Sequence, residues 1–153
     1  MVIAGVASSG GHLVQLESLI KLGVPINLVM APTRPLAAVE YLEIPDCNLT
    51  TPVKTLLCTY RLLMLLVRTR PDLVISTGAA PGGIALIIAR IIGARTIWID
   101  SIANAERASL TGRLAKPFST IWISQWNTVA QREGGLYIGK IFSFFDSGNS
   151  TSV

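Results

Sequence analysis

Short apolar runs alternate with stretches of helical periodicity along most of this chain, and this alternation constrains the fold more than any other feature. These runs do not alternate between apolar and polar residues, as a strand with one solvent-exposed face would. Both faces of each predicted strand are therefore expected to be buried. The predicted strands are Val2–Val6, Ile26–Met30, Leu73–Ser76, Thr96–Asp100 and Ser119–Ser124, with a weaker candidate at Asp46–Thr50. Strands of this kind, separated by helices, predict an α/β, Rossmann-like parallel sheet with helices on both faces.

Helical periodicity fills the segments between the predicted strands. Apolar residues recur there at spacings of three and four, which places them on one face of a helix. The predicted helices are Gly11–Leu22, Arg34–Leu42, Pro52–Arg68, Pro81–Ile92 and Asn127–Glu133. We expect residues 1–145 to form one domain and residues 146–153, which are rich in Ser, Thr, Gly and Asn, to be a disordered tail.

The composition agrees with one buried sheet and excludes other classes of protein. The 153 residues suffice for one domain, since domains commonly have about 100–200 residues. Hydrophobic residues make up 50% of the chain and charged residues 14%, against about 25% charged in an ordinary soluble protein. Disorder over most of the chain and a two-lobed enzyme with separate substrate and cofactor domains are therefore excluded.

A transmembrane helix is not expected despite the apolar composition. A span needs about 20 predominantly apolar residues, and the candidates Thr55–Val67 and Gly82–Ile99 are interrupted by Arg61 and by Arg90 and Arg95, respectively. The chain begins directly with a strand-like segment, which predicts no signal peptide. We therefore expect a cytoplasmic chain, with any membrane contact peripheral.

The net charge of +4 and the pI of about 9.4 favour an anionic partner, such as a phosphorylated substrate or an anionic lipid. The basic residues are spread along the chain, without a basic arm or a zinc-finger spacing, so nucleic acid is not expected as a partner. Cys47 and Cys58 are expected to be buried thiols. No metal site and no cofactor is predicted.

Two strand-to-helix turns are rich in small residues: residues 7–12 (ASSGGH) and residues 76–83 (STGAAPGG). In a doubly wound sheet such turns lie at the carboxyl ends of strands, where ligands bind at the switch point of strand order. Glycine backbones and helix N-termini favour phosphate there. The candidate pyrophosphate-binding residues are Ser8, Ser9, Gly10, Gly11, Thr77, Gly78 and Ala79. The first turn carries neither a dinucleotide fingerprint nor a P-loop, and glycine is also common in turns that bind nothing.

His12, the single histidine, begins the helix that follows the first turn. A helix N-terminus disfavours a further positive charge, so a neutral imidazole is expected. Such an imidazole can act as general base toward a sugar hydroxyl. The alternative is a histidine that only caps or packs the helix.

A polar segment follows the strand Thr96–Asp100. Asp100 ends this strand, so it is expected to face the same crevice as the two turns and is a second candidate for the base. Its alternative role is to cap a turn. Ser101, Asn104 and Arg107 follow and are candidates for contacts with an acceptor or a partner subunit.

Lys54, Arg61 and Arg68 are seven residues apart and share a stripe of the helix Pro52–Arg68, whose other residues are mainly Leu, Met and Val. The stripe is either the solvent face of a helix packed on the sheet, or a surface that contacts lipid phosphates while its neighbours enter the membrane interface.

The motifs occur in an order that resembles a known family. They are ASSGGHL (7–13), RPDLVISTG (70–78), IWIDS (97–101), SLTGRLAK (109–116), ISQW (123–126) and YIGKIF (137–142). The series resembles the membrane-recruiting, acceptor-side subunit of the two-subunit N-acetylglucosaminyltransferase of dolichol-linked oligosaccharide synthesis. It is more similar still to the bacterial exopolysaccharide relatives of the PssD type. The paired turns also look like those in the acceptor domain of MurG-type transferases.

The resemblance implies the N-terminal, acceptor-binding half of a GT-B glycosyltransferase. The UDP-sugar would be bound by a separate catalytic partner subunit, the C-terminal half, and this chain alone is expected to transfer no sugar. The implied acceptor is a lipid-pyrophosphate-linked saccharide at the inner face of the cytoplasmic membrane. The residues that match the family's two loops are Ser9, Gly10, Gly11, His12, Thr77 and Gly78. Asp100, followed by Ser101, stands where the family commonly has Glu.

Two rival functions stay open. A stand-alone Rossmann-like module would bind a nucleotide or another phosphorylated small molecule without catalysis, although a dinucleotide fingerprint is lacking. In a purely structural scaffold the glycines only make turns, and bulky replacements at Gly10 or Gly78 would affect stability alone.

Overall fold

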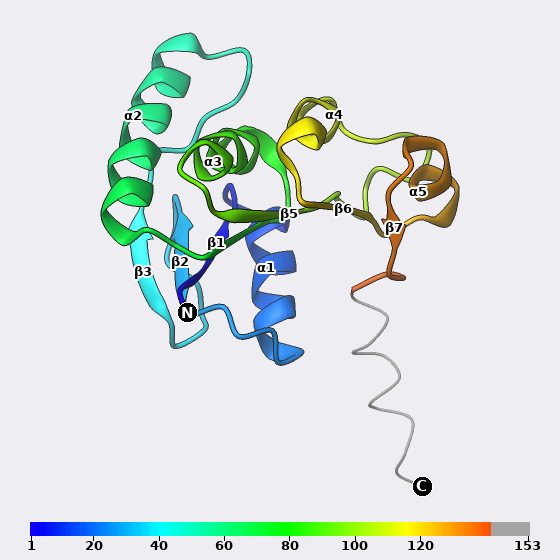
Figure 1. Cartoon of the computed structure of the whole chain (residues 1–153), viewed down its shortest axis with the longest axis horizontal. Helices are drawn as coiled ribbons and strands as arrows, with labels where there is room; N and C mark the ends of the chain where they lie inside the picture. Colours follow the sequence, from blue (N-terminus) through cyan, green and yellow to red (C-terminus); the bar gives the residue numbers. More distant parts are fainter. Residues whose placement is uncertain (142–153) are drawn as a thin grey trace, which may run out of the picture.

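The computed structural model describes residues 1–141, within which seven strands form one sheet (Figure 1). The strands are Ile3–Val6 (β1), Leu28–Ala31 (β2), Glu40–Glu43 (β3), Leu73–Ser76 (β4), Arg95–Ile99 (β5), Ile121–Ser124 (β6) and Leu136–Tyr137 (β7). Their order in the sheet is β3-β2-β1-β4-β5-β6-β7, and all neighbouring pairs are parallel. The expected parallel, Rossmann-like sheet is confirmed.

Helices cover both faces of this sheet, as expected. They are Gly11–Lys21 (α1), Pro52–Thr69 (α2), Ala79–Ile91 (α3), Leu110–Ala115 (α4) and Asn127–Glu133 (α5), with a 3₁₀ turn at Lys116–Phe118. Helix α1 packs on one face, whereas α2, α3 and α4 lie together on the other (Figure 1).

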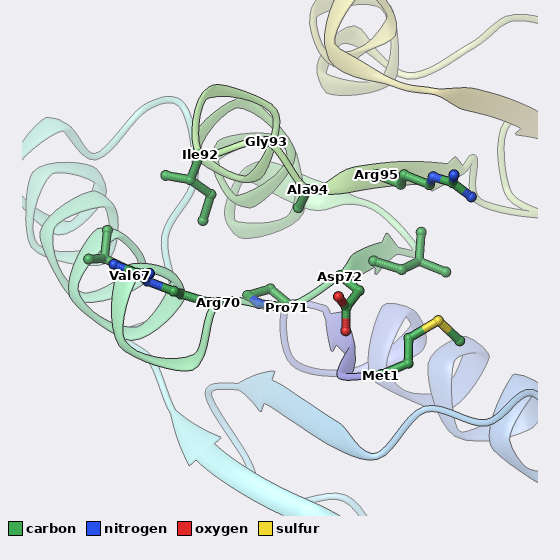
Figure 2. A pocket seen from close by; sticks show the side chains of 10 residues that line it. Met1, Val67, Arg70, Pro71, Asp72, Ile92, Gly93, Ala94 and Arg95 are labelled. Atoms are coloured by element: carbon green, nitrogen blue, oxygen red, sulfur yellow. The ribbon is translucent and has the colours of Figure 1, made fainter.

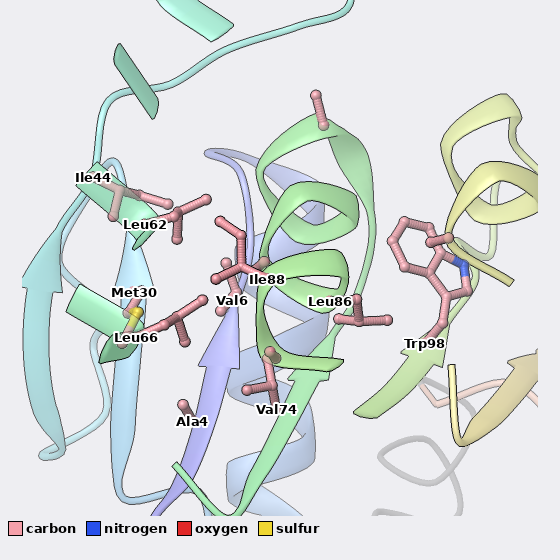
Figure 3. Packing of buried hydrophobic residues seen from close by; sticks show 14 of the residues in the cluster. Ala4, Val6, Met30, Ile44, Leu62, Leu66, Val74, Leu86, Ile88 and Trp98 are labelled. Carbon is pink, nitrogen blue, oxygen red and sulfur yellow. The ribbon is translucent and has the colours of Figure 1, made fainter. Parts of the chain in front are cut away.

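The core explains why the strands appear in the sequence as continuous apolar runs. Successive side chains of a strand point to opposite faces. In β1, Ala4 and Val6 join the cluster under α2 and α3, while Ile3 joins the cluster under α1. Figure 3 shows the first cluster, in which Leu62 and Leu66 of α2 approach the sheet. Both faces are buried, so both sets of residues are apolar.

Strand β1 is the point at which the order of the sheet reverses. The chain proceeds from β1 outward through β2 to β3, then returns to pair β4 on the other side of β1. The turns after β1 and β4 therefore flank one crevice at the carboxyl edge, because α1 and α3 leave on opposite faces. This is the topological switch point at which doubly wound sheets bind ligands.

The predicted helix at Arg34–Leu42 is wrong. Residues 34–39 form no helix, with bends at residues 36–39, and Glu40–Glu43 is the edge strand β3. Pro35 lacks an N–H donor and disfavours helical geometry at the preceding residue. Residues 40–43 instead pair with β2 as a parallel strand. The Tyr41 hydroxyl also donates a hydrogen bond to the Ala31 carbonyl oxygen at 3.2 Å.

The weak strand predicted at Asp46–Thr50 is also wrong, because this segment is a loop that ends in a turn before α2. The side-chain oxygen of Asn48 accepts hydrogen bonds from Thr50 N at 3.0 Å and from the hydroxyl of Thr51 at 3.1 Å. Such side-chain bonds compete with the ladder of a sheet.

Besides β3, three elements were not predicted: α4, the 3₁₀ turn after it, and the short strand β7. Helix α3 begins at Ala79, two residues before the predicted start at Pro81. The expected disordered tail, residues 146–153, and Phe142 of the last motif lie outside the described residues.

No helix within residues 1–141 is long and apolar enough to cross a bilayer. Cys47 and Cys58 are buried free thiols, as expected. Burial raises the pKa of both thiols, which keeps them protonated and unreactive.

Candidate functional site

Two helix N-termini meet at the carboxyl edge of β1 and β4. Helix α1 follows Gly10 and helix α3 follows Gly78, and no side chain among the described residues caps either N-terminus. The first N–H groups of a helix have no partner within it. These groups and the two helix dipoles favour an anion in the crevice between the turns.

His12 and Thr77 hold the two turns together by reciprocal hydrogen bonds. His12 Nδ1 lies 2.9 Å from the carbonyl oxygen of Thr77. The Thr77 hydroxyl donates in return to the carbonyl oxygen of His12 at 2.6 Å. A carbonyl oxygen only accepts, so Nδ1 must carry the proton. In the neutral imidazole Nε2 then keeps its lone pair and can accept a proton from a bound hydroxyl.

Gly78 allows this contact because its backbone lies against the imidazole. A Cβ atom built at Gly78 would lie 2.6 Å from both Cε1 and Nδ1 of His12. The φ angle of Gly78 is 131°, where side-chain-bearing residues are strained. Ala79 follows with a φ of 62°. Strained backbone of this kind clusters at binding and catalytic sites.

A cavity of about 330 Å³ opens beside His12. It is lined by Ser8, His12, Asp46, Cys47, Asn48, Thr51, Lys54 and Ala79. Of the predicted site residues, the cavity therefore brings together Ser8, His12 and Ala79. Ser9 and Gly10 are exposed in the turn before α1, Gly11 is exposed at the first position of α1, and Thr77 and Gly78 are buried behind the imidazole.

Asp46 and Lys54 were missed by the sequence analysis. The hydroxyl of Ser9 donates to Asp46 Oδ2 at 2.5 Å, which ties the loop before α2 to the first turn. Lys54 is the single Lys or Arg among the residues that line the cavity. The sequence held one signal: Asn48, two threonines and Pro52 are typical of a turn that opens a helix.

Asp100 lies outside the lining of this cavity and is saturated with donors. The carboxylate is 1% exposed. It accepts hydrogen bonds from Trp98 Nε1 at 3.2 Å, Asn104 Nδ2 at 3.2 Å, and the amide and hydroxyl of Ser109 at 3.1 and 2.7 Å. These bonds fix the loop between β5 and α4. The geometry therefore favours the alternative of a turn-organising carboxylate over that of a base.

The three residues predicted to contact an acceptor or partner lie within this same loop. The hydroxyl of Ser101 accepts a hydrogen bond from Gln15 of α1 at 3.4 Å, which connects the end of β5 to the helix of the first turn. The side-chain amide of Asn104 donates a hydrogen bond to Asp100, and Arg107 is exposed. None of the three lines the cavity beside His12.

Replacing Asp100 by Asn is expected to destabilise the fold. The amide keeps the shape but has one acceptor oxygen, so buried donors of Trp98 or Ser109 lose their partner. We expect the free energy of unfolding to fall by about 2–4 kcal/mol, given the cost of unpaired buried donors around a lost charge. Urea unfolding with an unchanged m-value measures it. The control, Glu106→Gln at an exposed carboxylate, should stay within about 0.5 kcal/mol; equal losses would contradict this role.

A larger cavity of about 760 Å³ lies at the opposite edge of the sheet (Figure 2). It is bordered by the end of α2, the start of β4 and the end of α3, with Arg70, Asp72 and Arg95 among its lining residues. Asp72 Oδ2 accepts the Val2 amide at 2.6 Å. The lining of this larger cavity contains no residue of the two small-residue turns, so the smaller cavity is the candidate site.

Comparisons with known proteins identify the family of this chain. The family model described as "Oligosaccharide biosynthesis protein Alg14 like" matches residues 41–141. The chain is 33% identical over 70 residues to the UDP-N-acetylglucosamine transferase subunit ALG14 of Eremothecium gossypii, covering 42% of this chain and 31% of that protein. It is 29% identical over 84 residues to the subunit of the same name from Mus musculus, covering 50% and 39%. The chain thus spans well under half of these relatives.

Solved structures share the fold at low sequence identity. MurG of Acinetobacter baumannii superposes with a TM-score of 0.61 at 16% identity, over 81% of this chain and 41% of that one. The UDP-GlcNAc 2-epimerase of Methanocaldococcus jannaschii gives a TM-score of 0.64 at 11% identity, over 87% and 41%. At these identities the likeness concerns the fold alone.

Proposed function

Because this chain belongs to the Alg14-like family of oligosaccharide biosynthesis proteins, we propose that it is the acceptor-binding and recruiting subunit of a two-component glycosyltransferase. A separate GT-B subunit binds the UDP-sugar, and the enzyme adds the sugar to a lipid-pyrophosphate-linked saccharide in exopolysaccharide or oligosaccharide biosynthesis. The proposed place of action is the inner face of the cytoplasmic membrane. Support comes from the two relatives, which are named subunits of a UDP-N-acetylglucosamine transferase.

One observation carries the proposal: the reciprocal hydrogen bonds between His12 and Thr77. They join two turns that the sequence separates by 65 residues, and they orient Nε2 as a proton acceptor beside a cavity. In a purely structural scaffold the same bonds would only fasten the two turns together, so the cavity beside His12 is what favours the proposal over that rival.

The pyrophosphate is proposed to lie between the two helix N-termini. The amides that follow Gly10 and Gly78 would donate to its oxygens, and Ser8 would line its path into the cavity. Lys54 would add a positive charge from the first turn of α2. Asp46 would hold the first turn in place through Ser9.

His12 is the proposed base that takes the proton from the acceptor hydroxyl as the sugar is transferred. Its Nε2 meets the requirement that a base keep an available lone pair near the substrate. Asp100 is proposed to position the neighbouring loop, because its oxygens are already occupied by protein donors.

Reconstitution tests the two-subunit assignment. The chain, a GT-B subunit recovered by co-purification with it, and the two together are each incubated with a labelled UDP-sugar and a lipid-pyrophosphate-linked acceptor. We expect transfer only when both subunits are present. Robust transfer by this chain alone would refute the proposal. Saturable binding of the UDP-sugar by this chain alone, measured by calorimetry, would favour the rival of a stand-alone nucleotide-binding module.

A further inference from the structure

Two buried glutamines connect helix α1 with the carboxyl ends of β5 and β6. Gln15 lies in α1 and is 3% exposed, and Gln125 follows β6 and is 1% exposed. Gln125 Nε2 donates to Gln15 Oε1 at 3.3 Å and to the carbonyl oxygen of Asp100 at 3.0 Å. Gln125 Oε1 accepts a hydrogen bond from the amide of Ile141 at 2.9 Å. The two glutamines thus join segments that the sequence separates by 110 residues.

Backbone groups fix the orientation of both side chains. The Ile141 N–H can only donate and the Asp100 carbonyl can only accept, so the oxygen of Gln125 faces the first and its nitrogen faces the second. The other N–H of Gln125 therefore meets the oxygen of Gln15. The nitrogen of Gln15 is left to donate to the hydroxyl oxygen of Ser101 at 3.4 Å. We call the series Gln125, Gln15 and Ser101 the glutamine relay.

The glutamine relay is an unusual feature of a helix that otherwise packs through apolar side chains. Leu13, Leu16 and Leu19 of α1 belong to the apolar cluster on this face of the sheet. A buried amide at Gln15 adds little stability over an apolar side chain, because the amide must lose its water before it bonds within the protein. Hydrogen bonds are directional, however, whereas apolar contacts are not. What the amide adds is therefore a defined position for α1.

His12 shares a face of α1 with Gln15, because the two residues are three positions apart on the helix. The imidazole is tied to the carbonyl of Thr77, after β4, and Gln15 is tied to residues that follow β5 and β6. Directional bonds thus anchor α1 to the ends of three neighbouring strands. A shift of α1 along its axis would lengthen both sets of bonds and would move Nε2 of His12.

We propose that Gln15 and Gln125 are positioning residues for His12. Their hydrogen bonds fix α1 at the carboxyl edge of the sheet, so that the imidazole keeps its Nδ1 proton on the Thr77 carbonyl and presents Nε2 to the acceptor hydroxyl. Neither glutamine is among the residues that line the cavity beside His12, so both act through α1. The inference deepens the proposed function and rests on it only for the role of His12 as base.

The tautomer of His12 provides the first test. His12 is the single histidine of the chain, so nitrogen-15 labelling of histidine in a chain without a histidine tag gives one imidazole, whose two nitrogens NMR distinguishes. We expect the neutral ring of the unaltered chain to carry its proton on Nδ1. Gln15→Met keeps the length of the side chain and removes the bonds to Gln125 and Ser101. It should give a mixture of both tautomers, because the bond to Thr77 sets which nitrogen is protonated. An unchanged tautomer in this variant would overturn the proposal.

Thr96→Val is the matched control. Thr96 is fully buried near the amino end of β5, and its hydroxyl donates to the carbonyl of Phe118 at 2.6 Å and accepts the amide of Thr120 at 2.9 Å. Valine keeps the shape and removes these bonds, so this variant should lose at least as much stability as Gln15→Met. It should keep the tautomer of His12 and full transfer per folded molecule. Equal tautomer changes in both variants would show that the tautomer follows stability alone, and would contradict the proposal.

Transfer by the reconstituted two-subunit enzyme gives the functional readout. Gln15→Met should lower kcat about tenfold and leave the KM for the acceptor within about twofold, because a displaced base slows the reaction without loosening the substrate. A glutamine with a merely structural role would lower the folded fraction and leave kcat per folded molecule unchanged, which would overturn the proposal. A raised KM at constant kcat would assign Gln15 to substrate binding instead, with the same consequence.

Gln125→Met tests the glutamine relay from its other end. This variant also leaves the Asp100 carbonyl and the Ile141 amide without a partner, so it should lose more stability than Gln15→Met and show the same change of tautomer. In the double variant the loss in kcat should be well below the product of the two single losses, since both changes break one relay. Independent losses would contradict the relay. If the tautomer changes as expected but the unaltered reconstituted subunits transfer nothing, the positioning of His12 stands and the proposed function fails.

Discussion

Replacement of His12 by Ala is expected to lower sugar transfer by the reconstituted two-subunit enzyme by about 10²–10⁴-fold, the range that general-base catalysis contributes. The imidazole is the one group in the small cavity whose nitrogen is oriented by a backbone carbonyl, that of Thr77, while its other nitrogen is left to accept a proton. The measurement is the rate of label transfer from the UDP-sugar at saturating acceptor, with the free energy of unfolding determined for the same preparation.

The variant His12→Asn separates a base from a structural histidine. An Asn side chain can still donate to the carbonyl of Thr77, but it cannot accept a proton in the reaction. If His12 is the base, His12→Asn should be about as impaired in transfer as His12→Ala, although closer to the unaltered chain in stability. Restoration of transfer by Asn would show that His12 only caps and packs its helix, the alternative left open by the sequence.

Replacement of Gly78 by Ala is expected to lower transfer about 10²-fold, because displacement of a catalytic group by about 1 Å can cost this much. The new methyl group would lie 2.6 Å from two atoms of the His12 ring, so the imidazole must move. The φ of 131° adds strain of about 1–3 kcal/mol for a residue with a side chain. Transfer per folded molecule and the free energy of unfolding are measured together.

Gly93→Ala is the matched control. Gly93 also has a positive φ, 91°, but a Cβ there would have no neighbour within 4 Å. This variant should lose stability through backbone strain alone and keep full transfer per folded molecule. If Gly78→Ala behaved in the same way, the glycine would serve only the turn, as the scaffold hypothesis holds.

The strands could be predicted wherever both of their faces are buried. Leu73–Ser76 was predicted with the bounds that β4 has, and β1, β2, β5 and β6 were predicted to within two residues. Strand β3 could not be found in this way, because it lies at the edge of the sheet and its four residues are exposed or half-buried. Its position depends on pairing with β2, which leaves no apolar run in the sequence.

The two turns of the candidate site could be predicted from the sequence, but the other residues that line its cavity could not. Small residues after β1 and β4 identify the two turns, since strand ends and helix starts follow from local pattern. Asp46 and Lys54 reach the cavity only through the packing of α2 and the loop before it, a tertiary arrangement without a local signal. The role of Asp100 likewise depends on Ser109 and Trp98, whose donors the fold brings to it.

The hydrogen bonds between His12 and Thr77 also bear on the order in which the molecule is assembled. They close a loop of 65 residues that contains β2, β3 and α2. Contacts of such sequence separation form late, since the entropy of loop closure must be met before they contribute. During synthesis, the imidazole can take its place only after β4 has emerged and paired with β1. The crevice between the two turns therefore forms only once β4 is in place, and fragments that end before β4 cannot contain it.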